Sequence, residues 1–471
     1  MTKKTYCNPL PLPDYPRGYG SMDKAHGDKW PHKVRRDFRE TADPTVVYHE
    51  NKWYLYPSCG MAYVSDDFVT WTRHPVADVG YAPTVLYYRK KFYLTACGAP
   101  LFEADGPLGP FREIGPFTAP DGKPVAPWND PMLFEDDDGS VYVYWGIGSP
   151  GIFGARLDPE RPNLMVTAPK VLFSYNPLHE WERYGDFNED KNQSYVEGPW
   201  MFKNGKTYYL TYAAPGTEFR SYGMGCYVSK KPLGPFQYQK LNPILRDPDG
   251  LVHGPGHGCV VRGPGNTIWA FYTCLVRNHY LFERRIGMDP AGIDSKGNLF
   301  VLGASDIPQW QPGIMKDPWK GNDTGLLPVT VNRPVLASTE KYGREAAYAV
   351  DNNIRTWWEP EDSDKSPWME IDLQGKFEVS ACRLLWQEPG LDYDKGFVPA
   401  PFRYRIEIFG DGSQWSTVVD RTASEEDLLI DYRTFEAVSA RKVRLSVTGW
   451  PMGVGVGVLE FTVFGTQGGK G

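Results

Sequence analysis

The sequence predicts an all-β protein in which a five-bladed β-propeller is followed by a β-sandwich, and two observations lead to this fold class. The first is a strand–turn–strand layout that occurs five times before residue 303. Repeats of about 40–50 residues with several strands each are typical of propeller blades, and longer gaps indicate loop insertions. The second is a change, after residue 331, to short alternating strands, which are typical of a sandwich.

Each of the five copies begins with a marker residue, which is followed by an apolar strand, a polar turn and a second strand. In "YVEGPWMFKNGKTYYLTY" (195–212) the marker is Glu197, and the Asn204-Gly205 turn is a strong hairpin signal. The markers are spaced by 39, 48, 67 and 61 residues, and they are Asp43, Ala82, Asp130, Glu197 and Gly258.

Three of these markers are carboxylates, and a propeller brings them together. The innermost strand of each blade lines the central channel, so Asp43, Asp130 and Glu197 from copies one, three and four should surround one pocket. Clustered acids repel one another, so a purely structural interpretation needs cations or a metal to balance them. The competing interpretation is chemistry that uses two or three carboxyl groups, of which glycoside hydrolysis is the leading example.

Five motifs in this order resemble glycoside hydrolase family 43 across about residues 8–303: "ADPTVV", "NDPMLF", "VEGPWMF", "HGPGHG" and "FERRIGMDPAGIDSKGNLF". The resemblance implies a five-bladed propeller enzyme that hydrolyses glycosides with inversion. It implies that Asp43 is the general base, Glu197 the general acid, and Asp130 the helper that raises the pKa of Glu197 and orients it.

The same resemblance suggests three further pocket residues. His257, beside the fifth marker, is expected to orient Asp130 or to hold a hydrated ion near the propeller axis, rather than to be a core histidine. Arg284 aligns with a substrate-contacting arginine, and because Arg284 and Arg285 alternate on one strand, only one of them can face the pocket. Trp128, next to "NDP", is a candidate for stacking on sugar, with core packing as the alternative.

We expect three segments: a propeller hydrolase domain at 1–303, a linker packed on the propeller at 304–330, and a sandwich at 331–471. The linker is rich in Pro, Gly and Asp. The sandwich includes short strands at 368–373 and 381–386. A chain ending near Asn322 would keep all three carboxylates, so we expect the sandwich to be separable without loss of turnover on a small aryl glycoside.

The sandwich motifs "AVDNNIRTWW", "WMEIDLQ" and "LEFTVFG" resemble the factor V/VIII type C domains, which are discoidin-like jelly rolls also grouped as carbohydrate-binding module family 32. The resemblance implies sugar binding or a bracing role, and a structural Ca²⁺ held by hard oxygen ligands. A simple hydrogen-bonded turn is the alternative. The implied ligands are Asp351, Asn353, Thr356 and Glu460.

Composition fits a carbohydrate enzyme and excludes other classes. Aromatic residues make up 14% of the chain, with 16 Trp and 29 Tyr, which suits sugar-stacking surfaces, although β-rich folds also favour them. A net charge of −7 argues against nucleic acid as a partner, because proteins that bind nucleic acid usually carry an excess of basic residues. No stretch approaches the roughly 20 apolar residues of a membrane span. No organic cofactor motif is present, and the oligomeric state is left open.

The N-terminus and the cysteines bear on the compartment. Met1 leads into "TKKTYCNPLPLP" without the apolar core of a signal peptide, which favours the cytoplasm, or a secreted or periplasmic protein whose leader has been removed. The seven cysteines have no paired spacing, and an odd number fits free thiols better than a disulfide framework.

For function, the sequence favours an exo-acting furanosidase that releases terminal α-L-arabinofuranosyl or β-D-galactofuranosyl groups from oligosaccharides or polysaccharides. The alternatives are a β-xylosidase or endo-arabinanase of the same fold, and a non-catalytic sugar-binding propeller. The N-terminal segment at 6–40, which we call the lead, and the insertion at 150–194 in the third copy favour a closed pocket and hence exo action.

Overall fold

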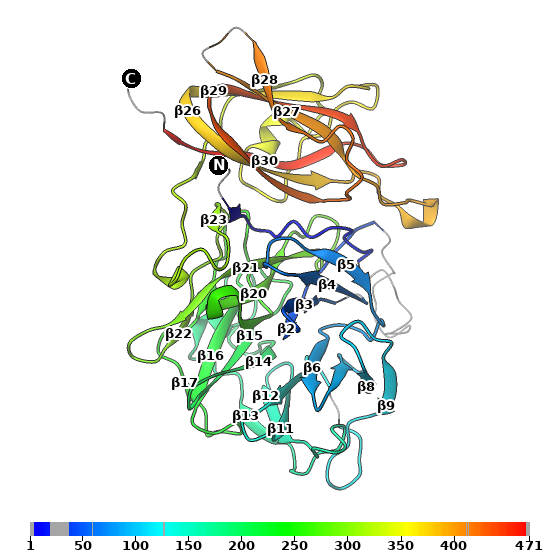
Figure 1. Cartoon of the computed structure of the whole chain (residues 1–471), viewed down its shortest axis with the longest axis vertical. Coiled ribbons are helices and arrows are strands. Elements are labelled where there is room, and N and C mark those ends of the chain that lie inside the picture. Colours follow the sequence, from blue (N-terminus) through cyan, green and yellow to red (C-terminus); the bar gives the residue numbers. More distant parts are fainter. Residues whose placement is uncertain are drawn as a thin grey trace.

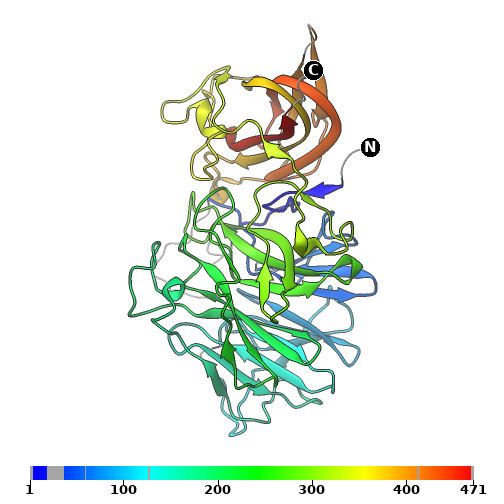
Figure 2. The same cartoon turned by 90° about the vertical axis from the view of Figure 1, so that its left-hand side faces the viewer.

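The computed structural model describes residues 4–18, 37–58, 60–125, 128–410, 412 and 414–467, which form strands and a few 3₁₀ helices of three or four residues. Five antiparallel sheets form a ring, and a sixth, larger sheet forms a separate body at one end of the molecule (Figure 1). The view turned by 90° shows the same two bodies stacked along the long axis (Figure 2). The predicted propeller followed by a sandwich is confirmed.

The five blades follow the five sequence repeats in order, each running from the innermost strand outward. Blade one is β2 (Thr45–His49), β3 (Lys52–Tyr56), β4 (Met61–Ser65) and β5 (Thr72–Pro75); blade two is β6 (Thr84–Tyr88), β7 (Lys91–Thr95), β8 (Leu101–Ala104) and β9 (Arg112–Gly115); blade three is β10 (Met132–Glu135), β11 (Val141–Trp145), β12 (Ile152–Arg156) and β13 (Lys170–Phe173); blade four is β14 (Glu197–Asn204), β15 (Thr207–Ala214), β16 (Gly223–Ser229), β17 (Gln237–Tyr238) and β18 (Leu245–Arg246); blade five is β19 (Gly258–Arg262), β20 (Ile268–Leu275), β21 (Arg284–Ile293) and β22 (Leu299–Val301).

The innermost strands β2, β6, β10, β14 and β19 contact one another in sequence, and β19 contacts β2, which closes the ring. The marker residues stand at the entrance to these strands. Asp43, Ala82 and Asp130 share a left-handed backbone with φ of 51°, 47° and 46°. Each precedes a proline, and a following proline disfavours the right-handed helical region. The repeat in sequence is therefore also a repeat in backbone conformation, and it directs equivalent side chains to the centre.

The strand order of the sandwich is β24-β30-β26-β29-β27-β28, and β25 pairs with the first part of β26, at Met369–Ile371. The sequence predicts short strands at 368–373 and 381–386, but the structure joins them into one 20-residue strand. Register shifts between Asp372 and Phe377 and between Val379 and Ala381 bend this strand, so its two halves serve different parts of the jelly roll. The strands are β24 (Leu327–Pro328), β25 (Val335–Ala337), β26 (Trp368–Gln387), β27 (Arg403–Phe409), β28 (Trp415–Asp420), β29 (Ile430–Gly449) and β30 (Gly457–Gln467).

The N-terminal lead and the segment after blade five run between the two bodies (Figure 1). Strand β1 (Thr5–Tyr6) pairs with β23 (Gln309–Trp310), and β24 then joins the sandwich sheet beside β30. The helical turn η5 (Pro318–Lys320) contacts β21 of blade five. The described part of the lead thus packs at the domain interface, while residues 19–36 lie outside the described part of the chain.

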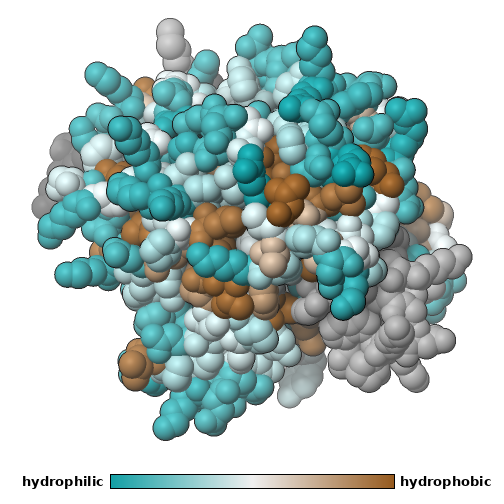
Figure 3. All heavy atoms as spheres, turned by 90° about the horizontal axis from the view of Figure 1, so that it is seen from below, coloured by the Kyte–Doolittle hydropathy of each residue, from teal (hydrophilic) through white to brown (hydrophobic). Residues whose placement is uncertain are grey.

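The end of the propeller away from the sandwich is mainly hydrophilic, with smaller hydrophobic areas between polar side chains (Figure 3). Within the described residues, no helix has the length and apolar character needed to cross a membrane. Six cysteines are free thiols, as predicted, and Cys59 lies outside the described residues; the six are Cys7, Cys97, Cys226, Cys259, Cys274 and Cys382.

Candidate active site

A cavity of about 150 Å³ is lined by the entrances to the inner strands. Five residues proposed from the sequence line it: Asp43, Asp130, Glu197, His257 and Arg284. The remaining lining residues are Tyr81, Cys97, Asn129, Ile147, Thr217, Tyr222 and Phe282. The structure therefore brings together the three carboxylates that the repeats predict.

Asp43 is held by three hydrogen bonds, one donated by its backbone and two accepted by its carboxylate. Its backbone N–H donates to Thr273 Oγ1 at 2.8 Å. Ser58 Oγ donates to its Oδ2 at 2.7 Å, and Arg284 Nη1 donates to its Oδ1 at 3.2 Å. Both carboxyl oxygens accept hydrogen bonds, which fixes the orientation of this side chain.

Arg284 is buried beside Asp43, and its guanidinium lies 5.9 Å from the centre of the Tyr81 ring and 5.3 Å from that of Phe282. Its Nε donates to Glu40 Oε2 at 3.3 Å. Burial acts to lower the pKa of Arg284, but Asp43 and Glu40 outweigh burial and hold the pKa above its ordinary value. The guanidinium is a permanent cation in the pocket wall.

Arg285 turns to the opposite face of β21, as the alternation predicts. Its Nη1 donates to the carbonyl oxygens of Arg39 at 2.8 Å and Arg284 at 2.9 Å, and its guanidinium lies 4.9 Å from the centre of the Tyr15 ring. Arg284 is therefore the arginine of this pair that lines the pocket.

Glu197, the first residue of β14, is buried and accepts a hydrogen bond from Tyr222 Oη at 2.6 Å. Burial raises the pKa of Glu197 well above its ordinary value, and the charge of Asp130 raises it further. The hydrogen bond from Tyr222 acts in the opposite direction. A carboxyl in this environment retains its proton at a pH where ordinary glutamates are ionised, as a general acid requires.

Asp130 links the other groups of the site. Its Oδ2 accepts from the N–H of Gly198 at 3.1 Å, next to Glu197. Its Oδ1 accepts from Cys97 Sγ at 3.1 Å, and its own N–H donates to the same sulfur at 3.1 Å. Burial raises the pKa of Asp130, His257 opposes this effect and Asp43 adds to it.

His257 lies between two of the acids, with Nδ1 3.7 Å from Asp130 Oδ2 and 3.9 Å from Asp43 Oδ1. Its ring packs against Gly198, where a Cβ would come within 2.6 Å of the imidazole Cγ. Gly198 also has φ of +61°, so the "EGP" motif needs glycine for both backbone and space.

Trp128 does not line the pocket. Its side chain is 8% exposed and stacks on Phe117 with ring centres 4.2 Å apart, within the core between blades two and three. Its Nε1 donates to Thr95 Oγ1. The tryptophan turns into the core although the neighbouring Asn129 and Asp130 line the pocket, so its placement supports core packing rather than stacking on sugar.

The insertion at 150–194 contributes no lining residue within the part of the chain that the structure describes. It packs on blade four instead: Tyr212 Oη donates to Glu182, and Trp181 packs against the Tyr212 ring. The lining residue of the pocket that precedes the insertion in the chain is Ile147.

Sequence reasoning missed Ser58, Cys97 and Thr273, yet a signal for them exists. Each comes 15 residues after a marker, namely Asp43, Ala82 and Gly258 respectively. All three accept a backbone N–H from the marker of the next blade. Tyr222 and Glu40 carry no such signal, because they reach the site from outside the repeated hairpins.

The predicted calcium ligands meet at one turn of the sandwich. Asp351 accepts from the N–H of Asn353 at 2.9 Å and from Thr356 Oγ1 at 2.7 Å. Glu460 on β30 accepts from the N–H of Asn352 at 2.9 Å, while its buried Oε1 has no hydrogen-bond partner. The four side chains therefore offer hard oxygen atoms, one of which is left unsatisfied, and this set fits a cation.

The ion predicted near the propeller axis has less support. Among the described residues, no group of three or more His, Cys, Asp or Glu is arranged to hold a metal ion. His257 instead lies within reach of Asp43 and Asp130, which fits the orienting role that the sequence also predicts.

A five-bladed propeller with a buried acid, an anchored carboxylate and a third carboxylate in one central pocket is the architecture of a glycoside-cleaving enzyme. The chain belongs to glycosyl hydrolases family 43, whose model matches residues 38–298. The C-terminal domain is of the factor V/VIII type C kind, since the model of the NedA-like, galactose-binding domain matches residues 348–445.

The chain is similar to curated enzymes with different substrates. It is 24% identical to a β-D-galactofuranosidase of Aspergillus niger over 49% of this chain and 73% of that protein. It is 26% identical to a β-xylosidase of Xylanibacter ruminicola over 45% of this chain and 69% of that protein. It is 25% identical to a non-reducing end α-L-arabinofuranosidase of Bacteroides ovatus over 41% of this chain and 34% of that protein.

Solved structures support the fold. A glycoside hydrolase with 19% identity covers 90% of this chain and 97% of its own, with a TM-score of 0.50. A thermostable family-43 glycoside hydrolase with 23% identity covers 65% of this chain and 99% of its own, also with a TM-score of 0.50. Membership of family 43 makes the protein a glycoside hydrolase that acts on carbohydrate.

Proposed function

We propose that the protein is an inverting, exo-acting hydrolase that removes terminal furanosyl groups, α-L-arabinofuranosyl or β-D-galactofuranosyl, from oligosaccharides or polysaccharides. The observation that carries this proposal is the contrast between two carboxyl groups of one small cavity. Asp43 has both oxygens engaged by donors, whereas Glu197 is buried with a pKa raised well above its ordinary value. Such a pair supplies a base and an acid at the same pH.

In the proposed reaction Asp43 removes a proton from a water molecule as the water oxygen attacks the anomeric carbon. The bond from that carbon to the leaving oxygen breaks, and Glu197 gives its proton to the leaving oxygen. Asp130 holds the backbone beside Glu197 through Gly198 and keeps the pKa of the acid high. Arg284 orients Asp43 and is positioned to donate to sugar hydroxyls.

Exo action is supported by the small size of the cavity and by its walls, to which Tyr81, Ile147 and Phe282 contribute. Furanosyl specificity is supported by similarity to a galactofuranosidase and an arabinofuranosidase, and the similarity to a β-xylosidase makes xyloside hydrolysis the second candidate.

The test is a screen of four aryl glycosides: the α-L-arabinofuranoside, the β-D-galactofuranoside, the β-D-xyloside and the β-D-galactoside. The Asp43→Asn variant is the negative control. We expect one furanoside to have the highest kcat/KM, and the variant to lose about 10²- to 10⁴-fold on it while retaining its melting temperature. Turnover of the xyloside alone would favour the second candidate. A folded protein that turns over none of these and no linear arabinan would favour a non-catalytic propeller.

We also propose that the sandwich binds Ca²⁺ through Asp351, Asn353, Thr356 and Glu460. The unsatisfied buried oxygen of Glu460 supports this proposal. Thermal unfolding of the EDTA-treated protein should shift to higher temperature on addition of Ca²⁺, because a ligand at about 100 times its Kd stabilises the native state by about 2.7 kcal/mol. The Glu460→Gln variant should lose the shift, and equal melting in EDTA and Ca²⁺ would contradict the site.

A further inference from the structure

A buried arginine connects the sandwich to the propeller. Arg39, 1% exposed, donates from Nη1 to Glu388 Oε1 at 3.0 Å and to Asp427 Oδ1 at 3.2 Å, and its Nη2 pairs with the other oxygen of Asp427. Both acids belong to the sandwich and are themselves 3% and 6% exposed. We call these three side chains the Arg39 clamp.

The propeller side of Arg39 is fixed as well. Its Nε donates to the carbonyl of Tyr15 at 2.9 Å, and its own carbonyl accepts from Arg285 Nη1 at 2.8 Å. The N–H of Thr41 donates to the carbonyl of Arg284 at 3.2 Å. The backbone at 39–41 is therefore attached to the β21 strand that carries the pocket arginine.

Glu40, the residue after Arg39, connects the clamp to the active site. Glu40 is fully buried, and its Oε2 accepts from Arg284 Nε at 3.3 Å. Arg284 in turn donates to Asp43, the first marker, which lies only three residues after Glu40. Ion pairs thus link Glu388 and Asp427 to Arg39 and link Glu40 to Arg284 and the proposed base, and the backbone between Arg39 and Glu40 joins the two sets.

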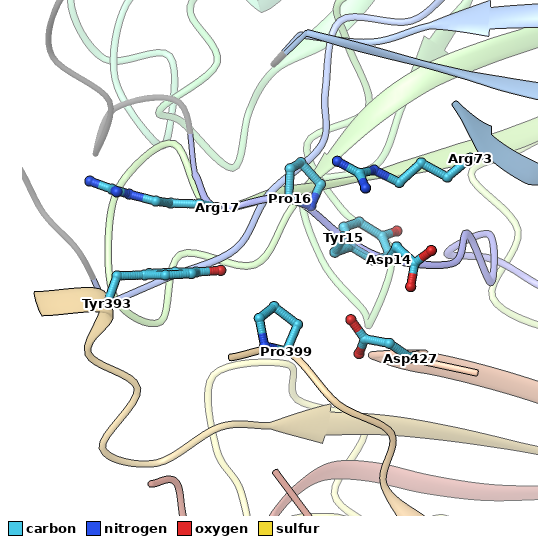
Figure 4. Close-up of a pocket in the computed structure, with 8 residues that line it drawn as sticks. All are labelled: Asp14, Tyr15, Pro16, Arg17, Arg73, Tyr393, Pro399 and Asp427. Carbon is cyan, nitrogen blue, oxygen red and sulfur yellow. The ribbon is translucent and has the colours of Figure 1, made fainter. Parts of the chain in front are cut away.

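The interface around the clamp is not a continuous apolar contact. A cavity of about 550 Å³ lies beside it, and the lead at Asp14–Arg17 crosses this cavity between Arg73 of blade one and Tyr393, Pro399 and Asp427 of the sandwich (Figure 4). The N–H of Asp14 donates to the carbonyl of Asp427 at 2.9 Å. Leu10, Leu12 and Tyr15 bury the lead in the main core, and the clamp adds a buried polar contact between this segment and the sandwich.

Stability alone does not explain the clamp. A buried ion pair loses about as much in desolvation as it gains in attraction, and apolar replacements of similar volume are often neutral or stabilising. Burial raises the pKa of Glu388 despite the opposing charge of Arg39, which shows that desolvation is large here. What a satisfied buried network does provide is one defined geometry.

We propose that the Arg39 clamp is a positioning device by which the sandwich fixes the catalytic base, and that Glu40 is the positioning residue that passes this constraint to Arg284 and Asp43. The inference rests on the proposed role of Asp43. It runs against the separability of the sandwich expected from the sequence, because removal of the sandwich would leave the buried Arg39 without either carboxylate.

The test uses the full-length chain and compares Arg39→Met with Arg383→Met. Arg383 is a matched control, since it is a buried interdomain arginine that donates to the carbonyls of Asn8 and Asp306 rather than to the carboxylates of the clamp. Both variants should lower the melting temperature. Only Arg39→Met should lower kcat, by about 10- to 100-fold, as expected when a reacting group is displaced by a fraction of an ångström to 1 Å.

Two further variants separate positioning from loss of fold. Arg39→Lys, which keeps the charge, should restore part of kcat. Glu40→Gln leaves the clamp intact and should lower kcat without the loss of melting temperature seen for Arg39→Met. Measurements below the unfolding transition that give wild-type kcat for Arg39→Met or Glu40→Gln would overturn the inference. The Asp43→Asn variant, measured in parallel, shows whether the base assignment has failed instead.

Discussion

The phenol of Tyr222 donates a 2.6 Å hydrogen bond to Glu197 Oε1 and opposes burial and the neighbouring carboxylates, chiefly Asp130, which raise the pKa of this glutamate. Burial and the charge of Asp130 favour the protonated form, while a hydrogen bond donated to the carboxylate favours the ionised form. The pKa of the proposed acid is therefore set by a balance in which one hydroxyl can be removed without changing the shape of the pocket.

Replacing Tyr222 with Phe should raise the pKa of Glu197 further, because the contact that lowers it is lost. The acid then keeps its proton to higher pH, and the basic limb of the kcat/KM profile should move upward. Tyr212→Phe is the control, since Tyr212 is also a buried tyrosine of blade four but donates to Glu182. A basic limb that stays in place, or moves to lower pH, would contradict the assignment of this limb to Glu197.

Glu197→Gln should distinguish substrates by their leaving groups. Activated aryl glycosides need little protonation of the leaving oxygen, so they should lose far less turnover than glycosides with alkyl or sugar leaving groups. Measured kcat values across a series of leaving groups should therefore fall more steeply with leaving-group pKa in the variant. Equal losses on good and poor leaving groups would remove Glu197 from the acid role.

The sequence was sufficient to bring Asp43, Asp130 and Glu197 together because all three stand within two residues before the proline that opens a repeated hairpin. A propeller places the starts of these hairpins around one axis. His257 and Arg284 were found from a resemblance that carried their positions. Trp128 takes the core-packing alternative because adjacent residues can point to opposite sides, and a large apolar ring is favoured in the core between two blades. The sequence does not predict Glu40 because its partner Arg284 lies 244 residues away, and no local sequence pattern indicates that contact.

Cys97 should be replaceable by serine but not by alanine. Burial and the charge of Asp130 raise the pKa of its thiol well above the ordinary value, so the S–H remains a donor to Asp130. Ser58 and Thr273 use hydroxyls at the equivalent positions of blades one and five. Cys97→Ala leaves the N–H of Asp130 without this acceptor, at a cost of about 1–3 kcal/mol, and should lower kcat. Denaturant unfolding and kcat of the two variants check this, and identical behaviour would contradict it.

Gly198→Ala and Gly205→Ala form a pair that separates backbone strain from a clash. Both glycines have left-handed φ, of +61° and +56°, so each substitution should cost about 1–2 kcal/mol in unfolding free energy. An added Cβ at Gly205 meets no atom within 4 Å, whereas at Gly198 it would press on the His257 ring. We expect only Gly198→Ala to lower kcat strongly. Equal kcat in the two variants would show that the position of His257 does not matter for turnover.

The stereochemical course depends on the separation of the two carboxyl groups, and we expect inversion. Asp43 enters the pocket from blade one and accepts hydrogen bonds from Ser58 and Arg284. Glu197 enters it from blade four and accepts a hydrogen bond from Tyr222. His257 lies beside Asp43 and Asp130 in the same pocket. Retention needs carboxyl groups about 5–5.5 Å apart and direct attack by one of them, whereas a wider pair of about 6.5–9.5 Å leaves room for water. If Asp43 activates water, an α-L-arabinofuranoside must first release β-L-arabinofuranose. Proton NMR spectra taken in the first minutes of hydrolysis, before mutarotation, distinguish the two anomers. Initial release of the α-anomer, or a trapped glycosyl-enzyme, would assign a nucleophile to this pocket in place of the base.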